Sequence, residues 1–199
     1  MSIVPIETFA AYVRDELGQI NVAHLTAALA AAENFVETHC ARNFNVASGT
    51  ATARVFGPSQ IVDYGTVVRV PDFMSTTGLV VTNNGTTVAA TGYQLEPLNG
   101  YDLTNSPMPY TAIRILNSVW TLDQMRATIS VTADWGWTTG TVPAVVIEAC
   151  KMLGKDFVTH RDSRFGFAET SVGAVSGARN WFVLNSLARY RRVESFALA

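Results

Sequence analysis

The sequence predicts an α+β protein, with a helical core of about four helices and an inserted antiparallel β module, a small barrel or sandwich. Apolar residues recur at spacings of three and four over the first forty residues and again after Pro143, as amphipathic helices require. Between these regions, short β-rich runs alternate with turn residues, which is typical of antiparallel strands. Apolar residues make up 48% of the 199 residues and charged residues only 15%, so the chain can bury a sizeable core.

Three segments follow from these patterns. Residues 1–49 form an N-terminal helix pair, residues 50–140 form the inserted β module, and residues 141–199 carry the C-terminal helices. We expect 1–49 and 141–199 to form one helical domain, because the β module interrupts a single helical pattern.

The first two helices have recognisable ends. Ile6–Leu17 follows Pro5, which a first helical turn tolerates, and Gly18 supplies a stop. Asn21 is a favourable N-cap for a second helix, Val22 to about Ala41. The predicted apolar stripe of this second helix is Val22, Leu25, Leu29, Ala32, Phe35, Val36 and Cys40.

The β module is predicted from six short runs and one hairpin signal. Asn83-Asn84-Gly85-Thr86 contains Asn-Gly, the strongest short hairpin signal. The stretch between Glu96 and Ala112 is rich in Pro, Asn and Gly and predicts a long exposed loop. The runs are Ala53–Phe56, Val67–Val70, Leu79–Thr82, Tyr93–Leu95, Ile113–Leu116 and Thr128–Ala133.

The C-terminal part is predicted to hold two helices separated by a loop. Pro143 opens a helix that runs to about His160. Residues 162–178 are rich in Gly, Ser and Ala without periodicity, and predict a flexible loop or a segment that orders on assembly. The last helix, Asn180–Val193, carries three arginines near its C-terminal end, where cations suit the helix dipole.

Enzymatic chemistry is not predicted. The sequence contains no phosphate-binding Gly-x-x-x-x-Gly-Lys loop, no Gly-x-Gly-x-x-Gly after a strand and no Gly-x-Ser-x-Gly elbow. The paired carboxylates Asp15 and Glu16 are adjacent and read as a solvated helix face, not as an acid–base pair.

A cofactor or metal site is not predicted either. His39-Cys40 with Cys150 and His160 offers four zinc-ligand types, but neighbouring helical residues point about 100° apart and no Cys-x-x-Cys spacing is present. We therefore expect both cysteines to be reduced core residues.

Three tryptophans leave a binding function open. Trp120, Trp135 and Trp137 could stack on a carbohydrate or bind a peptide. The favoured interpretation is structural: Trp135 and Trp137, two apart at a strand end, point to the same face and seal the β module against the third helix.

Charge is distributed unevenly along the chain. Through residue 140 there are six Lys/Arg against eleven Asp/Glu, and from residue 141 there are eight against five. This asymmetry indicates either an acidic partner for the C-terminal part or a solvated helical face. The sequence has no apolar run of the roughly 20 residues that span a bilayer, and we expect no secretory signal.

The order of several motifs resembles the head–tail connector (adaptor) family of tailed bacteriophages. A helix pair ends in Glu33–Phe44, a β segment closes with Val131–Trp137, Val142-Pro143 opens a helix that ends in Phe157–Arg161, and the tail is Leu187–Val193. The long β segment departs from the smaller, all-helical family members.

The resemblance implies a non-enzymatic structural protein of the virion neck, assembled in the host cytoplasm. It implies a ring, usually of twelve subunits, between the portal protein and a stopper or tail-completion protein, through which genomic DNA passes without sequence-specific binding. Another neck or tail-completion protein is the alternative from the same class. The C-terminal segment of family members packs on the portal, and the residues of this chain that correspond are Trp181, Arg189, Tyr190, Arg191, Arg192 and Phe196.

Overall fold

The computed structural model describes residues 2–17, 21–100, 107–121, 128–162 and 183–192. The chain splits into two compact units. The β unit is Asn45–Thr141, and the helical unit joins Ser2–Phe44 to Val142–Ala199. The α+β class predicted from the sequence is confirmed.

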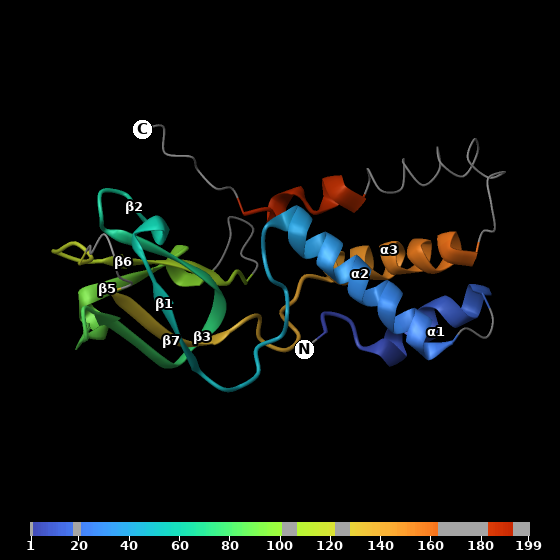
Figure 1. Cartoon of the computed structure of the whole chain (residues 1–199), viewed down its shortest axis with the longest axis horizontal. Coiled ribbons are helices and arrows are strands. Elements are labelled where there is room, and N and C mark those ends of the chain that lie inside the picture. Colours follow the sequence, from blue (N-terminus) through green and yellow to red (C-terminus); the bar gives the residue numbers. More distant parts are fainter. Residues whose placement is uncertain (1, 18–20, 101–106, 122–127, 163–182, 193–199) are drawn as a thin grey trace. The chain divides into compact units, whose positions relative to one another are not determined.

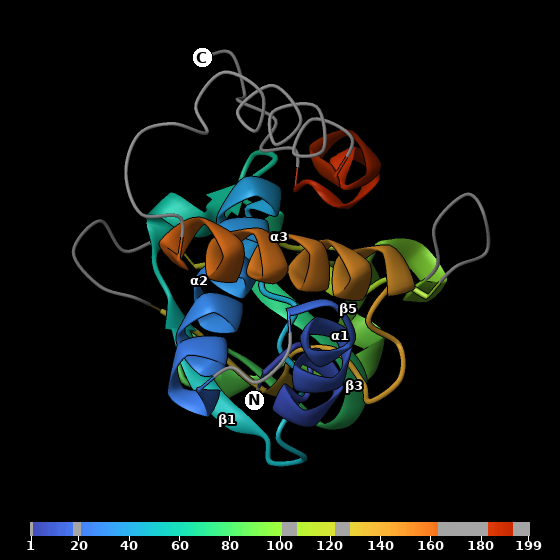
Figure 2. The same ribbon diagram turned by 90° about the vertical axis from the view of Figure 1, so that its right-hand side faces the viewer.

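The helical unit is built on α1 (Ile6–Leu17), α2 (Val22–Cys40) and α3 (Ala144–Asp162). Figure 2 shows α3 crossing in front of α2, and the two helices pack closely. After residues 163–182, which lie outside the described part, residues 183–186 are helical and lead into the short 3₁₀ turn η4 (Ala188–Tyr190).

The ends of the long helices follow the capping rules. The side-chain oxygen of Asn21 accepts a hydrogen bond from the backbone N–H of Ala23 at 2.8 Å, which confirms the predicted N-cap. At the other end of α2, Ala41 is left-handed with φ 48°, and its N–H donates to carbonyl oxygens of the last turn. The carbonyl of Pro143 accepts bonds from Val146 and Ile147, so α3 begins one residue later than predicted.

The buried stripe of α2 is narrower than the sequence predicted. Leu25, Leu29, Ala32, Val36 and Cys40 are buried. Val22 and Phe35 are 62% and 43% exposed, so their assignment to the stripe was wrong. The reason is geometric: Val22 stands in the first turn, and Phe35 points about 100° away from its buried neighbour.

The β unit is one seven-stranded antiparallel sheet with the order β1-β7-β3-β6-β5, to which β2 and β4 add as short partners of β3. Figure 1 shows these strands curving around a common interior. The strands are β1 (Thr52–Phe56), β2 (Ile61–Val62), β3 (Val67–Asn83), β4 (Thr86–Thr87), β5 (Tyr93–Glu96), β6 (Tyr110–Ile115) and β7 (Ile129–Trp135).

One continuous strand replaces two predicted strands. The runs at Val67–Val70 and Leu79–Thr82 belong to the 17-residue β3, whose first part pairs with β6 and whose later part pairs with β7. Pro71 lies between the two pairings, where a missing N–H costs no ladder bond. The register shifts after Phe73, and such irregularities bend a strand.

The predicted hairpin is present between β3 and β4. Asn83 pairs with Thr86, and the two central residues, Asn84 and Gly85, have φ values of 49° and 78°. Positive φ at both central positions defines the type I′ turn that suits a twisted hairpin.

The predicted loop between Glu96 and Ala112 is shorter than expected. Part of it, residues 101–106, lies outside the described residues, but Tyr110 already begins β6. The Tyr110 ring packs on Phe73 with 5.5 Å between ring centroids. The strand therefore begins two residues before Ala112, where its pairing with β5 starts, and the aromatic contact holds Tyr110 at this position.

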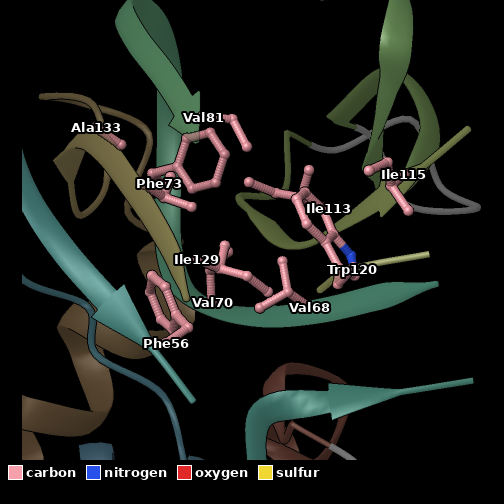
Figure 3. Packing of buried hydrophobic residues seen from close by; sticks show 11 residues of the cluster. Phe56, Val68, Val70, Phe73, Val81, Ile113, Ile115, Trp120, Ile129 and Ala133 are labelled. Atoms are coloured by element: carbon pink, nitrogen blue, oxygen red, sulfur yellow. The ribbon is translucent and has the colours of Figure 1, made fainter. Parts of the chain in front are cut away.

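The core of the β unit is a cluster of eleven buried apolar residues, shown in Figure 3. Strands β1, β3, β6 and β7 contribute residues to it, and Trp120 from the segment after β6 is only 1% exposed. The members are Phe56, Val68, Val70, Phe73, Val81, Ile113, Ile115, Trp120, Ile129, Val131 and Ala133.

A search of the described helices for a bilayer-spanning segment finds none of sufficient length and hydropathy.

Candidate functional site

Residues 183–192, the described part of the C-terminal segment, are fixed to the rest of the helical unit. Val183 and Leu187 are 3% and 0% exposed, and Tyr190 is buried as well. The Tyr190 ring meets Phe44 edge-on with 6.5 Å between centroids. The backbone N–H of Arg192 donates to the carbonyl oxygen of Cys40, the last residue of α2, at 2.8 Å. Apolar burial and a backbone bond therefore hold this segment against the end of α2.

The predicted docking residues are placed differently from one another. Arg189 and Arg191 are exposed, whereas Arg192 is half-buried. The Arg189 guanidinium lies over the Tyr190 ring at 5.0 Å from the centroid, a cation–π contact that orients the charge. Trp181 and Phe196 lie outside the described residues. The segment thus exposes Arg189 and Arg191, while the buried Tyr190 between them fixes its backbone to the same subunit.

A second exposed feature, which the sequence analysis missed, is the turn between β2 and β3. Tyr64 at its tip is 99% exposed. Asp63, Tyr64 and Gly65 all have positive φ, 52°, 55° and 85°, a conformation that non-glycine residues rarely adopt. The sequence signal was a gap of four residues ending in Gly-Thr between two apolar runs, but it predicts a turn without saying that an aromatic side chain stands outside it.

A charged network of Arg114, Asp63 and Glu96 holds this turn in place. The Arg114 guanidinium contacts the Asp63 carboxylate through Nη1 and the Glu96 carboxylate through Nε, both at 2.6 Å. Arg114 Nη1 also lies 3.2 Å from the hydroxyl of Thr66. The hydrogen bonds that the guanidinium donates to Asp63 and Glu96 raise the pKa of Arg114 above its usual value, so this side chain is a permanent cation.

Of the three tryptophans of the β unit, two are fully buried and Trp135 is half-buried. Trp120 and Trp137 are 1% and 0% exposed. Trp135 packs against Phe56 and Phe73 at centroid distances of 6.2 and 5.7 Å, and its indole N–H donates to the carbonyl of Thr52 at 2.8 Å. Full burial rules out Trp120 and Trp137 as stacking surfaces. Trp135 is half-buried and carries the Arg54 guanidinium 4.7 Å from its ring centroid, so a ligand contact through Trp135 and the predicted seal against the third helix both stay predictions.

The cysteines are free and buried. Burial raises the pKa of the Cys40 thiol to about 11 and that of Cys150 further still, so neither thiol is a ready nucleophile at neutral pH. Among the described residues no group of three or more His, Cys, Asp and Glu is placed to hold a metal ion. The side chain of His160 lies outside the described part.

No protein-family model and no curated protein matches the chain. Solved structures do. A chain in the neck of an empty gene transfer agent (GTA) particle, computed with C6 symmetry, is similar with a TM-score of 0.62 and 16% identity, over 98% of this chain and 92% of that one. The chain shares its fold with this particle protein.

Two further structures of the same kind of particle agree. A chain in the virion of a native GTA particle has a TM-score of 0.59 and 19% identity, over 98% of this chain and 92% of that one. A chain in the neck of a native GTA particle, computed with C12 symmetry, has a TM-score of 0.51 and 19% identity, over 99% and 96%. The likeness spans both units, and it is a likeness of fold.

Proposed function

We propose that this protein is a head–tail connector (adaptor) subunit in the neck of a tailed phage or phage-like particle. The observation that carries the proposal is the match of nearly the whole chain, β unit included, to chains in neck structures of gene transfer agent particles. A fold alone does not fix a function. The order of the sequence motifs supports the same function, and this order depends on the amino-acid sequence alone.

In this proposal the subunits form a ring, with twelve copies as the expected number. The neck structures that resemble the chain were computed with C6 and C12 symmetry, which supports a ring. The sequence is sparing of charge, at 15%, and apolar side chains as large as Tyr64 and Val55 are 99% and 69% exposed. Large exposed apolar groups favour coverage by partner subunits.

The C-terminal segment is the proposed portal-docking element. Its exposed cations, Arg189 and Arg191, stand on a base fixed by Tyr190 and the Arg192 backbone bond. Arginine and aromatic residues dominate interface energetics, and Trp181 and Phe196 complete the proposed set. Tyr190 acts in this arrangement by positioning Arg189, since its own ring is buried.

The opposite side of the ring is proposed to receive a stopper or tail-completion protein, and the lumen to let genomic DNA pass. DNA is held chiefly by Lys and Arg contacts to phosphate. Over residues 50–140 the sequence contains no lysine and fewer arginines than carboxylates, so a wall formed by this region lets DNA slide.

The test is a binding experiment with the portal protein of the same particle. Full-length chain and portal are mixed and their complex is measured by size-exclusion chromatography with light scattering. We expect one chain per portal subunit. Arg189→Glu or Arg191→Glu is expected to weaken binding at least about tenfold, equivalent to about 1.4 kcal/mol, and removal of residues 193–199 is expected to weaken it as well.

Arg14→Glu is the matched control, because it reverses an exposed cation on α1 and changes the net charge equally. Equal loss of binding for Arg14→Glu and Arg191→Glu would show a general charge effect and reject the docking segment. A chain that forms rings but ignores the portal is a different neck or tail-completion protein. A chain that neither forms rings nor binds portal is not a connector.

A further inference from the structure

The turn that carries Tyr64 is a preformed contact element. A tyrosine whose side chain is 99% exposed gains nothing from its own fold, and its left-handed backbone, φ 55°, is unfavourable for a residue with a Cβ. Strained, sparsely populated conformations that persist are typical of functional positions. Tyrosine is also among the residues enriched at interface hot spots.

The turn is rigid, which makes it suitable for insertion into a partner. The backbone N–H groups of Trp120 and Ile115 donate to the carbonyls of Gly65 and Thr66 at 2.8 and 2.9 Å. The Thr66 N–H donates to the Asp63 carbonyl at 3.1 Å, and Arg114 holds the Asp63 carboxylate. A side chain presented from a fixed backbone loses little further freedom on binding, so such a contact keeps more of its affinity.

A cavity in the helical unit has the size and chemistry to receive this side chain. Its volume is about 280 Å³. That is just below the range of small-molecule sites, which begins at about 300 Å³, and well above the roughly 150 Å³ that holds a benzene ring. The volume is large enough for one tyrosine ring. The cavity lies among α1, α3 and Val183, and the described residues that line it are Tyr12, Met152, Lys155, Asp156 and Val183.

The lining also suits a phenol. Met152 and Val183 offer apolar contact, and methionine adapts its shape to aromatic rings. The Lys151 ammonium lies over one face of the Tyr12 ring, 5.2 Å from its centroid, so Tyr12 offers its edge or its other face, and the Asp156 carboxylate is an acceptor for a phenolic O–H. Lys155 places a cation in the wall beside Asp156. On the other side, Asp63 in the turn and Glu96 at the end of β5 give two carboxylates against the single cation of Arg114, with which both pair.

We propose that the Tyr64 turn of one copy inserts into the Tyr12–Asp156 cavity of the next copy around the ring. This inference rests on the ring assembly of the proposed function. The turn belongs to the β unit and the cavity to the helical unit, so each copy supplies one of each. Such a head-to-tail contact closes into a ring when the rotation between copies permits. Nucleic acid is disfavoured as the occupant, because the excess carboxylate beside Tyr64 repels phosphate.

The experiment is photo-crosslinking in the full-length protein assembled on its portal. Tyr64 is replaced by p-benzoylphenylalanine, an aromatic residue that reacts with nearby C–H bonds on illumination. Isotopically heavy and light chains are mixed, and crosslinked peptides are identified by mass spectrometry. We expect the Tyr64 peptide of one isotope linked to the Met152 peptide of the other. The same photoreactive residue at Val55, 69% exposed on the β1 edge, is the matched control and should not link to Met152.

A second measurement uses simple variants. Tyr64→Ala is expected to weaken association between subunits more than tenfold, and Tyr64→Phe to retain most of it. The melting temperature of the monomer should stay unchanged in both, because the side chain touches solvent in the isolated chain. A fall in the melting temperature with Tyr64→Ala would mean that another part of the same chain uses Tyr64, and would overturn the inference.

The outcomes separate this inference from the proposed function. Rings on the portal with the Tyr64–Met152 link support both. Rings on the portal with Tyr64 linked to the portal, to a stopper protein or to another surface overturn the inference and leave the connector function standing. Links only within one chain overturn it as well. Absence of ring and portal binding rejects both.

Discussion

The two units of this protein reach stability by different means, and the difference determines which surfaces each leaves for partners. The β unit surrounds large buried side chains, including Trp120, Phe73 and Ile113, with one curved sheet. The helical unit uses small residues where helices meet: a Cβ on Gly154 of α3 would lie 2.8 Å from the ring of Phe9 on α1 and 3.7 Å from Ala32 on α2.

A sheet exposes its turns and edge strands to solvent and partners, whereas a helical bundle exposes the outer faces of its helices. The most exposed large apolar side chains of the β unit are accordingly at its turns and on its edge strand: Tyr64, Val55, Leu98 and Val119 are 99%, 69%, 59% and 57% exposed. The helical unit exposes Val22 and Phe35 along α2, at 62% and 43%, and adds Arg189 and Arg191 on its anchored C-terminal residues. The insertion of the Tyr64 turn and the docking of a cationic surface, both proposed above, are different kinds of contact for one chain to make.

The largest effect is expected from Phe73→Ala, which tests whether the two cores are independent. Phe73 is 0% exposed and contacts Tyr110 and Trp135. Removing a buried phenylalanine ring costs about 3–5 kcal/mol. In urea, with Trp181 of the helical unit replaced by Phe so that fluorescence reports the β unit alone, we expect the tryptophan fluorescence midpoint to fall strongly, because Trp120, Trp135 and Trp137 lie in the β unit. Circular dichroism at 222 nm, which follows the helices, should shift little.

Phe9→Ala is the reciprocal variant, since Phe9 is 0% exposed in the helical unit. It should shift the signal at 222 nm and spare the fluorescence. If both variants move both signals together, the chain unfolds as one cooperative unit, and the division into separately stable halves fails.

Gly136→Ala is expected to cost about 2–3 kcal/mol, because two effects combine. Gly136 has φ 124°, where a side chain is strained, and an added Cβ would lie 2.5 Å from the carbonyl oxygen of Asn45. That oxygen accepts the backbone N–H of Trp137 at 3.0 Å, so it is not free to move. Gly140→Ala separates the effects: it has φ 80° but open space around the Cβ, and about 1 kcal/mol is expected. Equal losses would show that strain alone matters. The measurement is urea unfolding followed by fluorescence.

The local elements were largely predictable, since their signals are short. Asn21 as N-cap, the Asn84-Gly85 hairpin and the start of α1 at Ile6 each depend on two to four neighbouring residues. The α+β class followed from periodicity, which is also local. These local features are present in the folded protein because tertiary packing is compatible with them.

The features that the sequence did not predict depend on residues that are distant in the sequence. The continuity of β3 across Pro71 depends on which partner strand each half meets, and this is information from β6 and β7. The exposure of Tyr64 depends on a left-handed backbone in the turn, and the burial of Tyr190 depends on Phe44, far away in sequence. Apolar composition predicts that a residue is buried or binds, and only the fold separates the two for Tyr64 and Tyr190.

Gly154→Ala is expected to destabilise the helical unit by about 1 kcal/mol. The substitution gains roughly 0.8–1 kcal/mol of helix propensity, but overpacking a filled core costs about 1–3 kcal/mol. The Phe9 ring, 2.8 Å from the new Cβ, is fully buried and has little room to move. Unfolding in urea followed at 222 nm gives the value.

The double variant Gly154→Ala with Phe9→Leu tests the cause through a double-mutant cycle. Leucine withdraws the atoms that the Cβ meets, so the cost of Gly154→Ala should vanish or reverse in this background. A cost that persists would place the strain elsewhere on α3.

The smallest effect is expected from Glu37→Gln, and it concerns pH dependence. Burial is the main cause that raises the pKa of Glu37 above 4.5; the backbone N–H of Phe44, which donates to Glu37 Oε1 at 3.0 Å, lowers it in part, and nearby Glu33 raises it. A carboxyl whose pKa is higher in the folded than in the unfolded state contributes stability below the unfolded value, and that contribution is lost as pH rises through the folded value. Glu37 therefore favours folding below about pH 4.5 and lowers stability once it is ionised.

Urea unfolding of the wild-type protein and Glu37→Gln, followed at 222 nm across pH 4 to 7, checks this expectation. Glutamine keeps an acceptor for the Phe44 N–H and removes the charge, so the variant should gain stability relative to the wild type as pH rises from 4, and the gain should level off above the folded pKa. The β unit, which does not contain Glu37, should show no such difference in its fluorescence transition. A gain that grows as pH falls would mean that the Phe44 hydrogen bond outweighs burial. It would also mean that the ionised carboxylate helps to hold the turn after α2, and with it the base of the C-terminal segment.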